Sequence, residues 1–124
     1  MVSDQQHLLI LGDLSYIYDS NALWNKNFPK NLKIVVLNDG GGGIFRLLDG
    51  PDRMDFFEEF NVTHHPVSLE LLSGAFGRRF AHAASFEELD HHMRSLCIPG
   101  SGLSVLEVDT TTCDNSRIFK ALFT

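Results

Sequence analysis

The sequence predicts an α/β fold, an open and mainly parallel sheet with helices on both faces. Residues 8–11, 34–37 and 103–108 are mostly apolar and have the character of strands. Their apolar residues are consecutive rather than alternating, which indicates strands covered on both faces, as in a parallel sheet. Helical patterns separate these segments, and the strand–helix–strand order is typical of parallel α/β proteins.

Each connecting segment carries a helix signal. Residues 21–27 are the first predicted helix, and Ser68 can cap the second. Ser85 and Glu88 have the spacing of a capping box, in which the serine accepts the Glu88 amide and the glutamate reaches back. A helix is therefore expected after Ser85.

Three further elements complete the expected order. Residues 79–83 are predicted to add a fourth strand, and residues 50–66 to form a long loop with one helical turn. A last helix is expected to open at Asp114 or Asn115. Its apolar residues are predicted to form a buried stripe: Ile118, Phe119, Leu122 and Phe123.

The chain has 124 residues, which is enough for one domain with a real core. It carries 10 basic and 16 acidic residues, a net charge of −6 with histidine neutral. This acidic balance disfavours a nucleic-acid or anionic-membrane partner, because there is no surplus of cations to neutralise phosphate. No apolar run is long enough to span a bilayer, and the amino terminus is too polar for a signal peptide, so a cytoplasmic protein is expected.

The first candidate motif is Gly12-Asp13-Leu14-Ser15, directly after the strand at 8–11. In open α/β sheets, ligands bind beyond the carboxyl ends of the strands. The Asp13 carboxylate could therefore coordinate Mg²⁺, and Gly12 would allow a phosphate to approach closely. The alternative is that Asp13 or Ser15 merely caps the next helical turn.

The second candidate motif is the run at 38–43, Asn-Asp-Gly-Gly-Gly-Gly, directly after the strand at 34–37. Asp39 offers another oxygen ligand, and the glycines free backbone groups for a metal or phosphate. A flexible turn or a glycine cap is the alternative. A P-loop is excluded because no Gly-Lys-Ser/Thr follows, and the dinucleotide fingerprint is excluded because its third small residue is missing.

The two motifs are more informative together. Asp13 and Asp39 are 26 residues apart, which is one strand–helix–strand unit. Neighbouring parallel strands would then deliver both carboxylates to one edge of the sheet. Mg²⁺ takes oxygen ligands and usually includes phosphate oxygens of its ligand among them. The sequence therefore predicts a metal–diphosphate site at this edge, helped by a helix N-terminus.

A family resemblance rests on two stretches. Gly-Asp-Leu-Ser-x-x-Tyr-Asp-x-Asn-Ala-Leu at 12–23 and Gly-Gly-Gly-Ile-Phe-Arg-Leu-Leu at 41–48 resemble the thiamine-diphosphate-dependent enzymes. Within that family they are similar to the transferases of menaquinone biosynthesis. Those enzymes decarboxylate 2-oxoglutarate and add the succinyl carbanion to isochorismate. The resemblance covers nearly the whole chain and implies the thiamine-diphosphate-binding fold.

The resemblance also implies a set of site residues. Asp13, Asp39 and the Gly41 carbonyl would be the Mg²⁺ ligands. Ser15 and neighbouring amides would contact the diphosphate, and Ile44 and Phe45 would lie beside the thiazolium and substrate. The implied cofactor-binding residues are Gly12, Asp13, Leu14, Ser15, Gly40, Gly41, Ile44 and Phe45.

This sequence departs from the family pattern at one position, and it contains no counterpart of the family's activating glutamate. The family usually has Asn-Asn where this sequence has Asn38-Asp39, which places one more negative charge near a diphosphate. The glutamate that activates the cofactor belongs to a separate pyrimidine-binding domain, usually on another subunit. No residue of this chain matches it, so no catalytic residue is assigned here.

The resemblance therefore implies that residues 1–124 are the C-terminal part of the diphosphate- and Mg²⁺-binding domain, without its first strand and helix. The piece is expected to be inactive alone, and the full-length enzyme to be a homodimer or homotetramer acting on small molecules. One alternative is another thiamine-diphosphate carboligase, similar to acetohydroxyacid synthase. The other is a non-catalytic α/β phosphate-binding module.

The remaining candidates are the histidines, Arg46 and the cysteines. Adjacent histidines rarely bind one metal together, so His64 and His65 are predicted to be solvated loop residues, with a substrate contact as the alternative. Arg46 could face an acidic substrate or form a surface salt bridge. Cys97 and Cys113 have no histidine partner nearby and are not expected to be nucleophiles.

Overall fold

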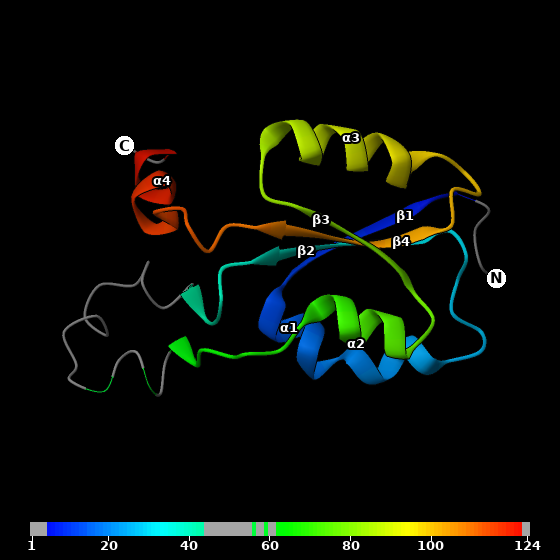
Figure 1. Ribbon diagram of the computed structural model, residues 1–124, viewed down its shortest axis with the longest axis horizontal. Coiled ribbons are helices and arrows are strands. Elements are labelled where there is room, and N and C mark those ends of the chain that lie inside the picture. Colours follow the sequence, from blue (N-terminus) through cyan, green and yellow to red (C-terminus); the bar gives the residue numbers. More distant parts are fainter. Residues whose placement is uncertain (1–4, 44–55, 57–58, 60–61, 123–124) are drawn as a thin grey trace.

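A computed structural model gives the arrangement of the elements (Figure 1), and the residues it describes are 5–43, 56, 59 and 62–122. The elements follow one another along the chain in this order: β1 (His7–Gly12), α1 (Asp13–Tyr18), the 3₁₀ helix η1 (Ser20–Trp24), β2 (Leu32–Asn38), α2 (Leu69–Ala75), β3 (Arg79–Ala83), α3 (Phe86–Cys97), β4 (Leu103–Asp109) and α4 (Asn115–Leu122). The predicted strands are all present, and the predicted helix at 21–27 is replaced by η1.

The described residues form one sheet of four strands, in the order β1-β2-β4-β3, and every neighbouring pair is parallel. This confirms the predicted α/β class and the predicted fourth strand at 79–83. Gly12 pairs with Leu37, and Asn38 pairs with Asp109. The carboxyl ends of β1, β2 and β4 therefore meet at one edge of the sheet.

Helices cover both faces of the sheet (Figure 1). On one face, α1, η1 and α2 pack on β2 and β4 around this core: Tyr16, Leu23, Ile34, Val36, Leu69 and Val105. On the other face, α3 packs on a second core: Val35, Ala83, Leu96 and Leu106. Ile34 and Val35 are consecutive and buried on opposite faces, which explains why the strand sequences are continuously apolar.

The capping box of α3 forms as the sequence predicts. The Glu88 amide donates to Ser85 Oγ at 3.2 Å, and the Glu88 carboxylate accepts the Ala84 amide at 2.8 Å. The glutamate thus reaches back one residue beyond the capping serine. This backbone hydrogen bond is the main cause that lowers the pKa of Glu88.

The prediction of a buried stripe on α4 is wrong. Ile118, Phe119 and Leu122 are exposed, while Phe123 lies outside the described residues. The reason is the position of the helix, which lies beyond the carboxyl ends of the strands rather than on a face of the sheet (Figure 1). An amphipathic pattern needs a facing surface to be buried, and no described residue of α4 is buried.

Strand β1 lies at the edge of the sheet, where helical cover is incomplete. Its residues Leu8, Leu9 and Ile10 are exposed, and so is Leu37 on the neighbouring strand β2. Leu8, Ile10 and Leu37 lie on one face of the sheet and Leu9 on the other, and among the described residues no further strand pairs with the outer edge of β1. None of the helices in the described part of the chain combines the length and the apolar character needed to cross a membrane.

A buried hydroxyl pair joins α1 to α2. The Tyr16 and Ser73 oxygens are 2.7 Å apart, and Ser73 donates its own proton to the Leu69 carbonyl at 2.6 Å. Tyr16 must therefore be the donor to Ser73. Burial raises the pKa of the Tyr16 phenol above its ordinary value of 10.0.

Replacement of Tyr16 by phenylalanine is expected to lower the free energy of unfolding by about 1 kcal/mol at neutral pH, because a buried hydrogen bond is lost. The folded pKa of Tyr16 is raised, so the contribution of the neutral phenol is complete below about pH 10 and is lost as the pH rises through the folded pKa. Urea unfolding at neutral and alkaline pH measures both effects. An equal alkaline loss of stability in wild type and Tyr16→Phe would contradict this assignment.

Candidate functional site

The two candidate motifs lie together at the carboxyl edge of the sheet. Strand β1 ends at Gly12 and α1 begins directly at Asp13, so the chain turns there without a connecting loop. Strand β2 ends at Asn38, and the glycine run follows. A cavity of about 420 Å³ is lined by residues of both motifs: Gly12, Asp13, Leu14, Ser15, Leu37, Asp39, Gly41, Gly42 and Gly43.

Asp13 is the most buried acidic group on this cavity, with only 2% of the residue exposed. One carboxylate oxygen accepts the Leu14 amide at 2.8 Å, and the other lies 3.0 Å from the His65 Nε2 atom. A buried carboxylate is costly unless it is paired with a cation or held by hydrogen bonds. Here the Leu14 amide and the His65 ring supply those hydrogen-bond partners.

A third segment, residues 62–65, closes over the glycine loop. The Gly42 amide donates to the Val62 carbonyl, and the His64 Nδ1 atom lies 3.0 Å from the Gly40 carbonyl oxygen. His65 then reaches Asp13 on the other motif. Three segments far apart in the sequence therefore form one connected site.

The prediction that His65 is a solvated loop residue is wrong, because its side chain is 11% exposed and contacts Asp13. His64 is exposed as predicted, yet its ring also contacts the site through Gly40. The sequence holds no periodic or spacing signal for these contacts. Only the residue type indicated a polar role.

One glycine of the loop, Gly41, is required by its surroundings. A Cβ atom on Gly41 would lie 2.5 Å from the Val62 carbonyl oxygen, so no other residue fits there without movement of the 62–65 segment. A Cβ atom on Gly43 would meet the Asp39 carboxylate, which is the end of a side chain and can turn away. The glycine run is thus a close-packed structure, and the alternative of a merely flexible turn does not describe it.

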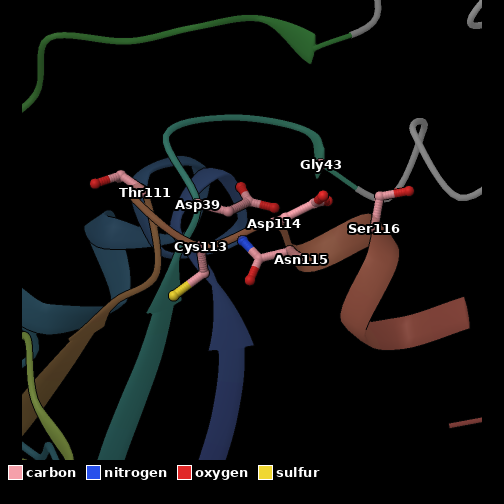
Figure 2. Close-up of a pocket in the computed structure, with 7 residues that line it drawn as sticks. All are labelled: Asp39, Gly43, Thr111, Cys113, Asp114, Asn115 and Ser116. Carbon is pink, nitrogen blue, oxygen red and sulfur yellow. The ribbon is translucent and has the colours of Figure 1, made fainter. Parts of the chain in front are cut away.

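Asp39 lies between two cavities. It lines the large cavity with Asp13, and it also lines a second cavity of about 80 Å³ beside the start of α4. Figure 2 shows its side chain near Asp114 and Asn115. One Asp39 oxygen accepts the Gly41 amide at 3.3 Å, so this carboxylate also shapes the glycine loop.

Most of the predicted site residues are brought together. Gly12, Asp13, Leu14, Ser15 and Gly41 all line the large cavity. Gly40 lies on the same loop, but its carbonyl faces His64 instead. The predicted residues Ile44 and Phe45 lie outside the described part of the chain, as does Arg46.

Side chains alone do not form a complete metal site. Among the described residues, no group of three or more His, Cys, Asp and Glu side chains is placed to hold a metal ion. Backbone carbonyls and oxygens of a bound ligand would have to complete the coordination. This is the usual situation for Mg²⁺, which keeps waters and binds through few carboxylates plus phosphates.

No family model matches the chain. Individual relatives do, and the three described here are each named 2-succinyl-5-enolpyruvyl-6-hydroxy-3-cyclohexene-1-carboxylate synthase. The Desulfotalea psychrophila protein is 44% identical over 108 residues, which is 87% of this chain and 20% of that protein. The Porphyromonas gingivalis protein is 40% identical over 117 residues, 94% of this chain and 20% of that protein. The chain belongs to this synthase family.

A third member of the synthase family supports the assignment. The Flavobacterium johnsoniae protein is 37% identical over 121 residues, 98% of this chain and 22% of that protein. The chain spans about a fifth of the length of the curated relatives it matches. Membership in the synthase family and the parallel sheet together confirm the predicted fold class, the thiamine-diphosphate-binding fold.

Proposed function

We propose that residues 1–124 are the C-terminal part of the diphosphate-binding domain of such a synthase, and that they anchor thiamine diphosphate through Mg²⁺. The observation that carries this proposal is the cavity at the carboxyl edge of the sheet, where the buried Asp13 carboxylate faces the glycine loop. Membership in the synthase family supports it, because the Flavobacterium johnsoniae relative aligns with 98% of this chain. Figure 1 gives the position of this edge, where β1 passes into α1 and β2 into the glycine loop.

Each motif has its own task in this proposal. Asp13, Asp39 and the Gly41 carbonyl would hold the metal ion, and Ser15 with neighbouring amides would hold the diphosphate oxygens. The donor set fits, since all the ligands are oxygens and the cavity wall beside them is glycine backbone. The extra negative charge of Asp39 is balanced in part by its hydrogen bond from the Gly41 amide. Thiamine diphosphate, when bound, supplies the electron sink for decarboxylation.

His65 is a positioning residue in this proposal. Its Nε2 atom lies 3.0 Å from Asp13 Oδ2, while the Leu14 amide holds Oδ1. Both carboxylate oxygens are thereby oriented before a metal binds. Replacement of a partner that orients a metal ligand typically lowers metal affinity by about 10-fold to 100-fold.

The whole protein is proposed to act on 2-oxoglutarate and isochorismate in menaquinone biosynthesis, in the cytoplasm and as a homodimer or homotetramer. The glutamate that activates the cofactor would come from a pyrimidine-binding domain outside this chain. The exposed apolar residues Leu8, Leu9 and Ile10 at the β1 edge support a larger assembly, because such a surface favours cover by further structure.

The test of this function compares two proteins. The full-length synthase is expected to release carbon dioxide from 2-oxoglutarate and to form the isochorismate adduct when Mg²⁺ and thiamine diphosphate are present. The 124-residue chain is expected to give no turnover, because it lacks the activating glutamate. Turnover by the 124-residue chain alone would overturn the assignment of these residues to an anchoring domain.

A further inference from the structure

A second cavity lies at the opposite end of the sheet from the candidate cofactor site. It has a volume of about 290 Å³ and is bounded by residues at the amino ends of β2, β3 and β4. Three of its lining residues are cationic, Lys30, Lys33 and Arg78, while Phe28 and Ser104 contribute an aromatic ring and a hydroxyl. None of the described residues that line it is acidic.

Lys33 is the most unusual residue of this cavity. It is only 5% exposed, and its ammonium donates to the Leu103 carbonyl at 2.6 Å. Within the described part of the chain, no carboxylate forms an ion pair with it. An ammonium has three donors, so a single neutral acceptor leaves a buried charge largely uncompensated.

Arg78 adds a second cation that is held in place. Its Nε atom donates to the Leu23 carbonyl at 3.1 Å, and its guanidinium carbon lies 4.0 Å from the centre of the Phe28 ring. Both partners are uncharged, so the positive charge of Arg78 is not neutralised by them. The stacked guanidinium is pre-organised and loses little freedom when an anion binds.

These positive charges are concentrated against the overall balance of the chain, which is −6. A pocket lined by one sign of charge raises the local concentration of ligands of the opposite sign. The volume lies near the lower end of the range for small-molecule sites, and larger ligands would exceed it. A small polyanion matches both the positive charge and the limited volume of this cavity.

We propose that this cavity binds a small organic anion that carries carboxylate or phosphate groups, held by Lys33 and Arg78 with Lys30 at the entrance. The carboxylate or phosphate oxygens would supply the acceptors that the buried ammonium of Lys33 lacks. The aromatic wall at Phe28 would contact the apolar part of such a ligand. This site is separate from the proposed cofactor site and does not depend on it.

Isothermal titration of the full-length protein with inorganic phosphate and with citrate tests the proposal. The buffer contains EDTA, which removes metal-mediated binding at the cofactor site, and sodium chloride keeps the ionic strength constant. Saturable binding of at least one anion is expected, with affinity lowered at least about tenfold in Lys33→Met, because a charge-assisted hydrogen bond is lost. Binding of citrate alone assigns carboxylates as the ligand class, and binding of phosphate alone assigns phosphates.

Lys26→Met is the matched control, since it removes the same charge from an exposed position that does not line the cavity. It is expected to bind like wild type. Lys30→Met provides a second test if Lys33→Met does not fold, because Lys30 is exposed and its loss should still weaken binding. The proposal is overturned if neither anion saturates wild type, or if Lys26→Met loses as much affinity as the cavity variants.

Discussion

Replacement of Asp13 by alanine in the full-length synthase is expected to abolish Mg²⁺-dependent binding of thiamine diphosphate, with an affinity loss of about 100-fold or more. The carboxylate is buried at the cavity wall, and each of its oxygens is already oriented. Calorimetric titration with thiamine diphosphate, with and without Mg²⁺, measures the effect.

The exposed Asp19 at the end of α1 is the matched control for Asp13. Asp19→Ala removes the same charge a short distance away and should leave the affinity within about twofold of wild type. The affinity of His65→Gln for thiamine diphosphate should lie between those of Asp13→Ala and Asp19→Ala. A loss of about 10-fold to 100-fold is expected, because this substitution disturbs only the orientation of Asp13. Wild-type affinity in Asp13→Ala would show that the metal site has been placed on the wrong residue.

Replacement of Gly41 by alanine is expected to lower cofactor affinity strongly and to reduce the free energy of unfolding by about 1–3 kcal/mol through overpacking. The new methyl group would lie 2.5 Å from the Val62 carbonyl oxygen and 3.2 Å from Val62 Cγ1. Val62 is fully buried, so it cannot move aside freely. The whole 62–65 segment must shift, and that segment holds His65 against Asp13.

Thermal unfolding and cofactor titration of the same Gly41→Ala preparation separate the two effects. Gly74→Ala is the matched control, because a Cβ atom on Gly74 meets nothing within 4 Å and the residue lies inside α2. That variant should be more stable than wild type by about 0.5–1 kcal/mol and should bind cofactor normally. Equal melting temperature and affinity in Gly41→Ala and wild type would mean that the close packing on Val62 is unimportant.

The sheet could be predicted from the sequence because its strands are covered on both faces. Ile34 and Val35 are buried in different cores, so the strand sequence is apolar at consecutive positions and carries a strong signal. The ends of these strands then located Asp13 and the glycine run at one edge. This placement does not require the order of the strands to be known, since all strands of a parallel sheet have their carboxyl ends at the same edge.

The contribution of His65 could not be predicted, because it arises from tertiary contacts across 52 residues. The prediction of a buried stripe on α4 was wrong for a related reason. An amphipathic pattern shows which side of a helix is apolar, but it does not show whether another surface covers that side. The dual role of Asp39, which lies between two cavities, likewise depends on where α4 begins in space. Local sequence patterns do not show which residues distant in the sequence come together in space.

The central claim is a metal-bridged diphosphate site at the carboxyl edge of the sheet, and its most direct test is a titration of the wild-type full-length protein. Thiamine diphosphate and ADP are compared as ligands, each with Mg²⁺ and with EDTA. The proposed site predicts binding of thiamine diphosphate that requires Mg²⁺ and exceeds the binding of ADP by about tenfold or more, equivalent to about 1.4 kcal/mol. Equal binding of the two ligands, or thiamine diphosphate binding that is unchanged by EDTA, would contradict it.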